Sequence, residues 1–245
     1  MSDDTIIEAI LLTKRYGARV ALDRVSLEVR RGTSLAVFGP NGAGKTTLIR
    51  ILASSLRPTS GTLRIAGRDP RGHDLETKAR IGLISHQTFL YDDLTARENL
   101  AFFARLYGTP NVSARADSLL DSLDLFDRAD DPVRTFSRGM QQRLSLARSL
   151  IHDPEIIFLD EPFTGLDPHA ASVLETTLTR LRENGRTLLV TTHDLSRGLD
   201  LSDRWIILSR GSLVAEGLSR SSDRAAVERS YFAHLSAAHR REEPA

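Results

Sequence analysis

The sequence predicts an α/β fold in which helices connect the strands of a mostly parallel sheet. Short apolar runs alternate with helix-like stretches before and after residues 92–152, an alternation that is typical of parallel strands with crossover helices. Within residues 92–152 the apolar residues instead recur at helical spacing, which predicts an all-helical insertion between two strands of the sheet. No internal repeat or low-complexity linker divides the chain.

The composition is that of an ordinary water-soluble protein. The chain has 245 residues, 40% hydrophobic and 27% charged, which suits one large α/β domain or two smaller ones. Its formal net charge of +1 provides no global field for a nucleic acid or a lipid surface. Since there is no cysteine, disulfides, thiolate metal sites and cysteine nucleophiles are excluded. No apolar run approaches the ~18 residues of a membrane span, and we expect no signal peptide.

The N-terminal part of the chain is expected to be rich in strands. Apolar or alternating runs predict strands at residues 6–12, 25–29, 35–38, 62–66 and 81–85. The turn after the first run carries the aromatic residue Tyr16. The last run leads into Gln87, which therefore lies near one end of a strand.

Helices dominate the middle of the chain. Thr95 and Glu98 form a capping-box pattern, which predicts the start of a helix that ends before Pro110. Helices are also expected at 113–124, at 139–152, from 168 to about 184 and at the C-terminus, with strands at 156–159, 187–192, 205–209 and 213–216. The last two strands are expected to form a hairpin.

Residues 39–46 read G-x-x-x-x-G-K-T between a predicted strand and a predicted helix. This is the setting of a phosphate-binding loop, in which small residues let backbone N–H groups converge on an anion at a helix N-terminus. Lys45 adds a full positive charge for the β- and γ-phosphates, and the Thr46 hydroxyl is placed to ligate Mg²⁺. The alternative interpretation is a glycine-rich turn without a ligand.

Two carboxylates end the strand at residues 156–159. Beside a phosphate loop, Asp160 suits the Mg²⁺ shell, and Glu161 is free to orient or deprotonate a water aimed at the γ-phosphate. A solvated acidic turn is the alternative. His193 also follows a strand and can hold the attacking water, and the Gln87 amide can reach the metal or the water; alone, neither residue indicates a function.

The ordered set of motifs resembles the ATP-binding cassette (ABC) ATPases, the nucleotide-binding domains of ABC transporters. The matching segments are Tyr16, Gly39–Thr47 (Walker A), Gln87 (Q-loop), Ser137–Arg143 (signature), Ile156–Glu161 (Walker B), Gly165–Asp167 (D-loop) and His193 (switch). The resemblance covers nearly the whole chain. It implies one P-loop NTPase (RecA-like) domain over residues 1–245, with an N-terminal antiparallel β portion. Residues 1–87 and 153–220 would form the catalytic core with the β subdomain, 88–152 a helical subdomain and 221–245 a C-terminal helix and tail.

The resemblance also implies a role for each matching residue. Catalytic roles fall to Glu161, His193, Lys45 and Gln87. Nucleotide contacts fall to Tyr16, Gly39, Pro40, Asn41, Gly42, Ala43, Gly44, Lys45, Thr46, Thr47, Ser137 and Gly139. Mg²⁺ ligation falls to Thr46, Gln87 and Asp160, so the expected cofactors are ATP and Mg²⁺.

The signature departs from the family's usual Leu-Ser-Gly-Gly-Gln. Here the residues are Phe136-Ser137-Arg138-Gly139-Met140, so an arginine replaces a glycine and a methionine replaces the glutamine. Ser137 and Gly139 remain, and the following helix would direct its positive end to the ATP of a partner subunit. Arg138 can pair with phosphate, contact the partner subunit or point into solvent.

The resemblance implies an ATPase that powers a transporter. It implies a head-to-tail dimer, a homodimer or a pseudo-symmetric pair, that sandwiches two ATP molecules, and separate transmembrane permease subunits. The chain would then lie at the cytoplasmic face of the cell membrane, attached through the permease, with residues 89–91 among the permease contacts. Residues 86–100 and the Ser-Arg-Gly-Met signature resemble the haem exporter ATPase of cytochrome c maturation; the alternative is a multidrug or antibiotic exporter ATPase. A soluble ABC ATPase acting on nucleic acid is disfavoured, because no sustained heptads separate Lys45 from Ser137, and import stays open.

Overall fold

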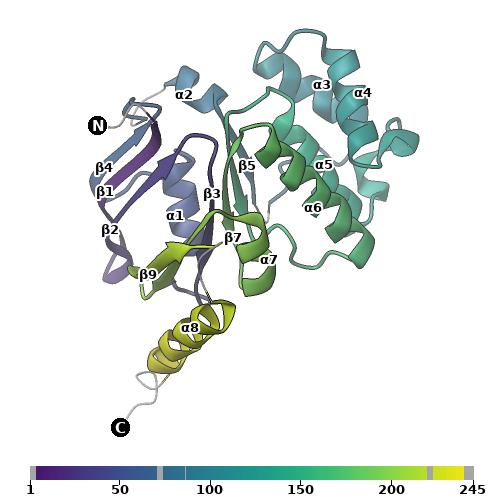
Figure 1. Cartoon of the computed structure of the whole chain (residues 1–245). Helices are drawn as coiled ribbons and strands as arrows, with labels where there is room; N and C mark the ends of the chain where they lie inside the picture. Colours follow the sequence, from purple (N-terminus) through teal and green to yellow (C-terminus); the bar gives the residue numbers. More distant parts are fainter. Residues whose placement is uncertain (1–3, 71–73, 86, 220–222, 240–245) are drawn as a thin grey trace.

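The computed structural model describes residues 4–70, 74–85, 87–219 and 223–239, and it contains two sheets (Figure 1). The first sheet has three antiparallel strands in the order β2-β1-β4. These strands are β1 (Thr5–Tyr16), β2 (Arg19–Arg30) and β4 (Ser60–Ile65). The N-terminal antiparallel β portion expected from the sequence is therefore confirmed, with a longer first strand than the apolar run indicated.

The second sheet has six strands in the order β5-β6-β7-β3-β8-β9. They are β3 (Ser34–Phe38), β5 (Ile81–Ile84), β6 (Ile156–Asp160), β7 (Thr187–Thr191), β8 (Arg204–Ser209) and β9 (Ser212–Leu218). The first five in this order pair in parallel, whereas β9 pairs antiparallel with β8 in the expected hairpin. Because β6, β7 and β3 are neighbours, the loops after their carboxyl ends meet at one edge of the sheet.

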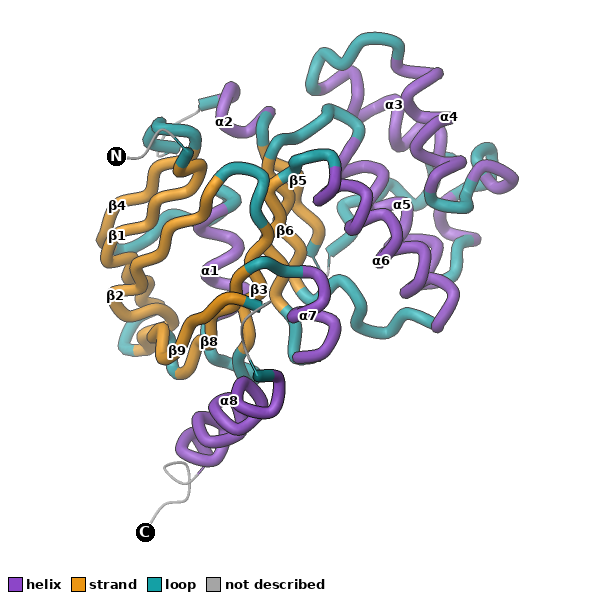
Figure 2. The backbone as a smooth tube through the Cα atoms, viewed as in Figure 1, coloured by secondary structure: helices purple, strands orange, loops and turns teal. Residues whose placement is uncertain are grey.

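The helices lie around the parallel sheet (Figures 1 and 2). Their bounds are α1 (Lys45–Leu52), α2 (Leu75–Ala79), α3 (Ala96–Leu106), α4 (Val112–Ser122), α5 (Arg138–Leu150), α6 (Pro168–Glu183), α7 (Leu195–Leu201) and α8 (Arg224–His239). Helices α3, α4 and α5 gather at one end of the molecule, and α1 lies between the two sheets. Two of these helices, α2 and α7, were not expected from the sequence, because each is only about two turns or less.

Local signals place the longer helices where the sequence predicted them. Thr95 caps α3: its hydroxyl accepts a hydrogen bond from the Glu98 N–H (3.1 Å), and the Glu98 carboxylate accepts one from the Thr95 N–H (2.8 Å). The Asp167 side chain caps α6 by accepting a hydrogen bond from the Ala170 N–H. Pro168 occupies the first helical position, where its missing N–H has no cost. Within α3, Leu100 is buried but Leu106 is 69% exposed, so the apolar stripe read from the sequence is only partly core.

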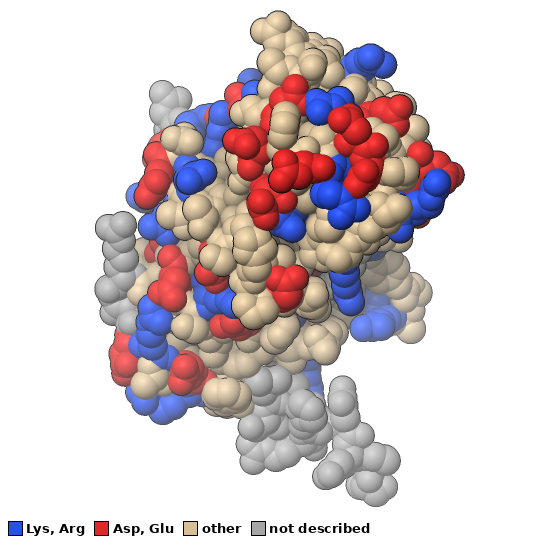
Figure 3. All heavy atoms as spheres, turned by 90° about the vertical axis from the view of Figure 1, so that its right-hand side faces the viewer, with Lys and Arg blue, Asp and Glu red and all other residues tan. Residues whose placement is uncertain are grey.

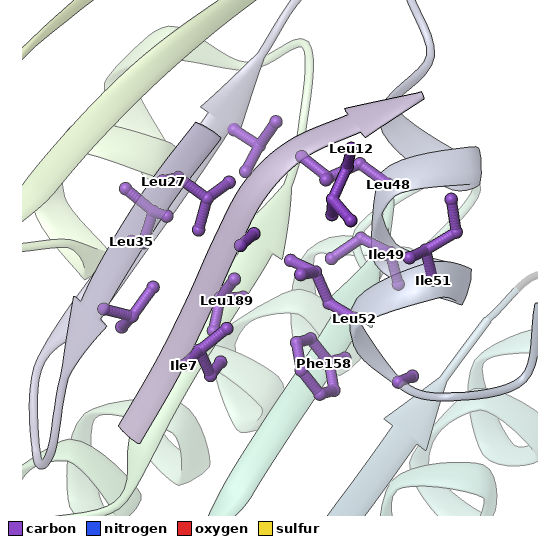
Figure 4. Packing of buried hydrophobic residues seen from close by; sticks show 14 of the residues in the cluster. Ile7, Leu12, Leu27, Leu35, Leu48, Ile49, Ile51, Leu52, Phe158 and Leu189 are labelled. Carbon is purple, nitrogen blue, oxygen red and sulfur yellow. The ribbon is translucent and has the colours of Figure 1, made fainter. Parts of the chain in front are cut away.

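The core is split by the parallel sheet. On one face, α1 packs between the sheets, with Ile49 and Leu52 against Phe158 and Leu189 of the parallel sheet and Ile7 of β1 (Figure 4). On the other face, the helices of residues 96–150 and α6 pack against β6 and β7. No helix among the described residues is long and apolar enough to cross a membrane. The division of the chain into subdomains stays a prediction.

Candidate active site

The loop between β3 and α1 can be built only with glycine at two of its positions. Gly44 has φ +107° and Gly39 has φ +156°, values that side-chain-bearing residues rarely adopt. A Cβ on Gly44 would lie 2.5 Å from the Ala21 carbonyl oxygen, and one on Gly39 would lie 2.4 Å from the Leu208 carbonyl oxygen. The loop is therefore wedged between β2 and β8, with the N-terminus of α1 directed into it.

Lys45 is almost completely buried inside this loop. Only 7% of the residue is exposed, and its ammonium donates a hydrogen bond to the Gly39 carbonyl (2.7 Å). The same ammonium lies 3.4 Å from Glu161 Oε1. A cation is thus already held at the point where the loop would receive phosphate.

A pocket of about 190 Å³, open to solvent, surrounds the loop. Its walls are residues 40–47, Arg19, Ala21 and Glu161. Arg19 was missed by the sequence analysis, because nothing in the turn before β2 marks it as close to the loop. Tyr16 is not part of the wall; it faces Arg19 across the β1–β2 turn and is 49% exposed. Its predicted contact with adenine stays a prediction.

Asp160 ends β6 and presents its carboxylate to the loop. It is 2% exposed, and its Oδ1 accepts hydrogen bonds from the hydroxyls of Thr46 (3.1 Å) and Thr191 (2.7 Å). Thr46 and Asp160 thus provide adjacent hard oxygen atoms, which fit Mg²⁺ because this ion is usually held by one or two protein oxygens together with substrate phosphates.

Glu161 is held in a strained backbone conformation beside Asp160. Its φ is +52°, and its N–H donates to both the carbonyl (3.1 Å) and the hydroxyl (3.0 Å) of Thr191. The carboxylate bridges two cationic or polar groups: Oε1 faces Lys45, and Oε2 accepts a hydrogen bond from His193 Nδ1 (2.9 Å). The side chain of Glu161 is 12% exposed and that of His193 is 66% exposed. The sequence analysis identified Glu161 and His193, but it recognised Thr191 only as part of a strand. Thr191 holds the Asp160 carboxylate and the Glu161 backbone N–H.

The remaining predicted residues lie outside the phosphate pocket. Gln87 is exposed, and within the described residues its side chain forms no hydrogen bond to Thr46 or Asp160; its carbonyl accepts one from Ser85 (2.9 Å). Ser137 caps α5 by accepting a hydrogen bond from the Met140 N–H (3.3 Å). Gly139 packs against α6, where an added Cβ would lie 3.2 Å from that of Ala170. Neither Ser137 nor Gly139 lines the pocket around Lys45.

The fold and this site define a nucleotide-hydrolysing protein of the P-loop class. A glycine loop on the N-terminus of α1, a buried lysine and two strand-end carboxylates meet at the edge of a parallel sheet, as phosphoryl transfer to water requires. The model of the ABC transporter family matches residues 22–164. The chain belongs to this family as an ATP-binding subunit with ABC-type ATPase activity.

Curated relatives include ATP-binding proteins named for daunorubicin resistance and for Nod factor export. The chain is 44% identical over 216 residues to the daunorubicin resistance ATP-binding protein DrrA3 of Streptomyces coeruleorubidus, an alignment that covers 87% of this chain and 68% of the relative. It is 40% identical over 208 residues to a Nod factor export ATP-binding protein I of Ralstonia nicotianae, covering 84% of this chain and 65% of the relative. The chain thus spans about two thirds of the length of these relatives.

Solved structures agree with the fold. An ATP-binding subunit of an ABC transporter superposes with a TM-score of 0.84 at 27% identity, covering 93% of this chain and 99% of that one. A dimeric ATP-binding cassette with bound ADP and Pi, described as a post-hydrolysis state, superposes with a TM-score of 0.80 at 28% identity, covering 88% and 100%. The predicted fold class is confirmed.

Proposed function

We propose that this chain is the ATPase of an exporter for drug- or antibiotic-class compounds, acting through a separate permease. The observation that carries the ATPase part is the Asp160–Glu161 pair, which Thr191 holds against Lys45 and Thr46. The observation that carries the export part is the similarity to an ATP-binding protein of daunorubicin resistance over 87% of this chain.

This proposal takes up the alternative reached from the sequence in preference to haem export. The names of the relatives refer to drug resistance and Nod factor export, and these names support drug-class export more than cytochrome c biogenesis. Haem export remains a prediction that rests on the resemblance of residues 86–100 and the signature alone.

In the proposed reaction, water attacks the γ-phosphorus, the bond to the bridging oxygen breaks, and ADP and Pi leave. The N–H groups of residues 39–46 and Lys45 hold the phosphates. Thr46 and Asp160 would hold Mg²⁺, which supplies positive charge to the phosphate oxygens. Glu161 takes the proton of the attacking water, and His193 orients the Glu161 carboxylate. Because Lys45 pairs with Glu161 in this structure, the arriving phosphate would give Lys45 a new partner and release Glu161 for catalysis.

A second copy of the ATPase would complete each site. Ser137 lies at the exposed N-terminus of α5 and outside the phosphate pocket, so it is available to the ATP of another subunit. Dimeric structures of similar cassettes support this arrangement. We therefore propose a head-to-tail dimer with two sandwiched ATP molecules.

The permease would dock on the outer face of α3. A groove there is lined by Leu94, Glu98, Ala101, Phe102, Arg105 and Leu106. Phe102 is 42% exposed and stacks edge-on against Tyr91, which is itself 50% exposed. An exposed apolar surface of this kind is typical of a protein-docking site, and it includes the segment after Gln87 that the sequence analysis selected. Docking there would place the chain at the cytoplasmic face of the membrane.

The charge distribution does not favour nucleic acid as a partner. On the face that α3–α6 present, acidic side chains gather in the upper part and basic ones are interspersed among them (Figure 3). A nucleic-acid site would instead require a continuous basic surface.

Cells that lack this chain test the proposal directly. We expect them to accumulate more daunorubicin than cells complemented with the wild-type chain, whereas Glu161→Gln should not complement. Glu183→Gln, an exposed carboxylate at the end of α6, is the control and should complement. Unchanged drug accumulation together with a loss of c-type cytochromes would contradict drug export and favour haem export.

A further inference from the structure

The Arg138 side chain lies flat on the loop that carries Glu161. A Cβ placed on Gly165 would meet three atoms of the guanidinium at nearly equal distances: 3.1 Å to Cζ, 3.2 Å to Nη1 and 3.3 Å to Nε. Because these three distances are nearly equal, the flat face of the guanidinium packs against Gly165 on the side where a side chain would project. Gly165 has φ +75°, so the residue that favours this backbone conformation also leaves room for the arginine.

Two further contacts tie the start of α5 to the same loop. The Gln142 amide donates a hydrogen bond to the Pro162 carbonyl (3.4 Å), and Gly139 lies close enough to Asp167 that an added Cβ would be 3.3 Å from its carboxylate. Arg138, Gln142 and Glu161 also line one small cavity, together with Thr88, Gln141, Thr164 and Leu166. The signature of this subunit therefore contacts the catalytic loop of its own subunit.

Backbone hydrogen bonds connect the residues on both sides of Gly165 to Glu161 and Phe163. The Thr164 N–H donates to the Glu161 carbonyl (3.2 Å), and the Leu166 N–H donates to the Phe163 carbonyl (3.3 Å). Gly165 thus lies within the second of two overlapping hydrogen-bonded turns, the first of which begins at Glu161. Because the Glu161 backbone is strained and its N–H is held by Thr191, a small shift of Gly165 would change the direction of the Glu161 carboxylate.

We propose that Arg138 is a positioning residue that couples the signature helix to Glu161 of the same subunit. The proposal rests on the proposed ATPase dimer, in which this signature closes over the partner's ATP. Closure of this signature over the partner's ATP would then shift Arg138, and through it the Glu161 carboxylate that acts on the ATP of its own subunit. This role differs from a contact of Arg138 with the partner's phosphate, because Arg138 packs on Gly165 and forms no ion pair within the described part of the chain.

Mixed dimers of two differently tagged chains separate the two roles. In each dimer one chain carries Glu161→Gln, so hydrolysis comes only from the Glu161 of the other chain. Arg138→Ala is placed either in the chain that retains Glu161 or in the Glu161→Gln chain. Single-turnover hydrolysis of ATP by tandem-purified dimers is measured in both, with ATP affinity and the thermal midpoint checked for each.

Arg138→Ala in the chain that retains Glu161 should slow hydrolysis about tenfold, since a small misplacement of a catalytic group has effects of this size. The same change in the Glu161→Gln chain should not alter the rate of hydrolysis, compared with a mixed dimer in which both chains retain Arg138. Arg138→Lys should slow hydrolysis in the same pattern, because it retains the charge but not the planar group. Arg134→Ala, an exposed arginine of the neighbouring turn that pairs with Asp93, is the matched control and should have no effect.

The opposite pattern, with slowing only when the Glu161→Gln chain carries Arg138→Ala, would overturn the proposal in favour of a contact with the partner's ATP. Equal rates in both dimers, equal slowing in both, or full rescue by lysine would also overturn it. If the Glu161→Gln chain did not dimerise with ATP at all, the proposed dimer would be wrong and this inference would fall with it.

Discussion

At the scale of single residues, the chemistry centres on the Glu161 carboxylate. It is nearly buried and shared between Lys45 and His193, and its backbone is anchored twice by Thr191. A carboxylate fixed in this way can accept a proton from a water molecule without first reorganising. Glu161, the proposed proton acceptor, directly follows β6, and the Thr191 hydroxyl that holds its N–H belongs to the neighbouring strand β7.

Glu161→Gln tests the general base alone, because the amide retains the size of the side chain and removes its proton affinity. We expect phosphate release by the purified chain to fall by about 10²–10⁴-fold, while the affinity for a fluorescent ATP analogue stays within a few-fold of wild type. Glu183→Gln serves as the control for both measurements. A wild-type rate of hydrolysis in Glu161→Gln would show that another group takes the proton.

His152 makes stability depend on pH. Its ring stacks on Tyr107 with centroids 3.9 Å apart, and its Nε2 donates to the Ile81 carbonyl (3.0 Å). Burial lowers the pKa of His152 in the folded chain, and the nearby Arg148 and Arg115 lower the pKa further, despite the opposing effect of the Ile81 carbonyl. The unfolded chain therefore binds a proton that the folded chain does not, in the pH range just below the ordinary value of about 6.5.

The stabilising contribution of neutral His152 should be complete above about pH 6.5 and should be lost as the pH falls below that value. His152→Phe retains the stack on Tyr107 and cannot titrate, so its stability should fall less steeply on acidification. Urea unfolding of both chains from pH 5 to pH 8 measures the two slopes. Parallel curves would contradict this role for His152.

At the scale of elements, α5 links the signature to the aromatic surface of α3. Ser137 and Arg138 lie at its N-terminal end. In its last turn, Arg148 donates a hydrogen bond to the Leu83 carbonyl (2.8 Å) in β5. The Arg148 guanidinium also lies over the rings of Phe89 (5.6 Å) and Phe103 (5.3 Å), and burial lowers its pKa. One helix thus contacts the catalytic loop, the segment after Gln87 and the proposed permease surface.

Phe102→Asp on α3 should separate hydrolysis from export. The side chain is 42% exposed and remote from the phosphate pocket, so the isolated chain should hydrolyse ATP at the wild-type rate. In cells the charge should weaken docking on the permease, and daunorubicin efflux should fall to the level of cells without the chain. Leu75→Asp, a residue of α2 that is 74% exposed, is the matched control and should export normally. Normal efflux by Phe102→Asp would exclude this groove as the docking site.

At the scale of the whole molecule, the phosphate pocket of this chain is open to solvent on one side. The pocket walls come from β2, the loop before α1 and Glu161, and residues of the signature are absent from them. A head-to-tail partner would supply Ser137 and the N-terminus of α5 to this open side. In the proposed dimer, ATP would bind the closed state more tightly than the open chain, and hydrolysis would reopen it.

Ser137→Arg should block this closure without affecting the first contact with ATP. In the Glu161→Gln background, ATP should shift the chain to a dimer in gel filtration, whereas adding Ser137→Arg should leave it a monomer. ATP affinity of the monomer should stay unchanged, since Ser137 is not in the pocket wall. Ser118→Arg, on the exposed side of α4, should dimerise normally. A dimer of Ser137→Arg, or loss of ATP binding by its monomer, would contradict the proposed composite site.

The sequence by itself determined the features that depend on neighbouring residues. The glycine loop before Lys45, the capping box of Thr95 and Glu98, and the carboxylates after a buried strand are all local patterns, because backbone conformation and capping involve residues only a few positions apart. Together with the alternation of strands and helices, these patterns were sufficient to predict the fold class and the part of the pocket wall formed by residues 40–47 and Glu161, but not Arg19 or Ala21.

Only the tertiary structure decided which distant residues contact the residues of these local patterns. Arg19 enters the pocket from another sheet, and Thr191 binds the Asp160 carboxylate and the Glu161 N–H from the neighbouring strand. Arg138 covers Gly165 after the chain has passed through a whole helix and strand. Such contacts depend on strand order and on how helices pack against the sheet, and packing is set by complementary surfaces that no short segment contains.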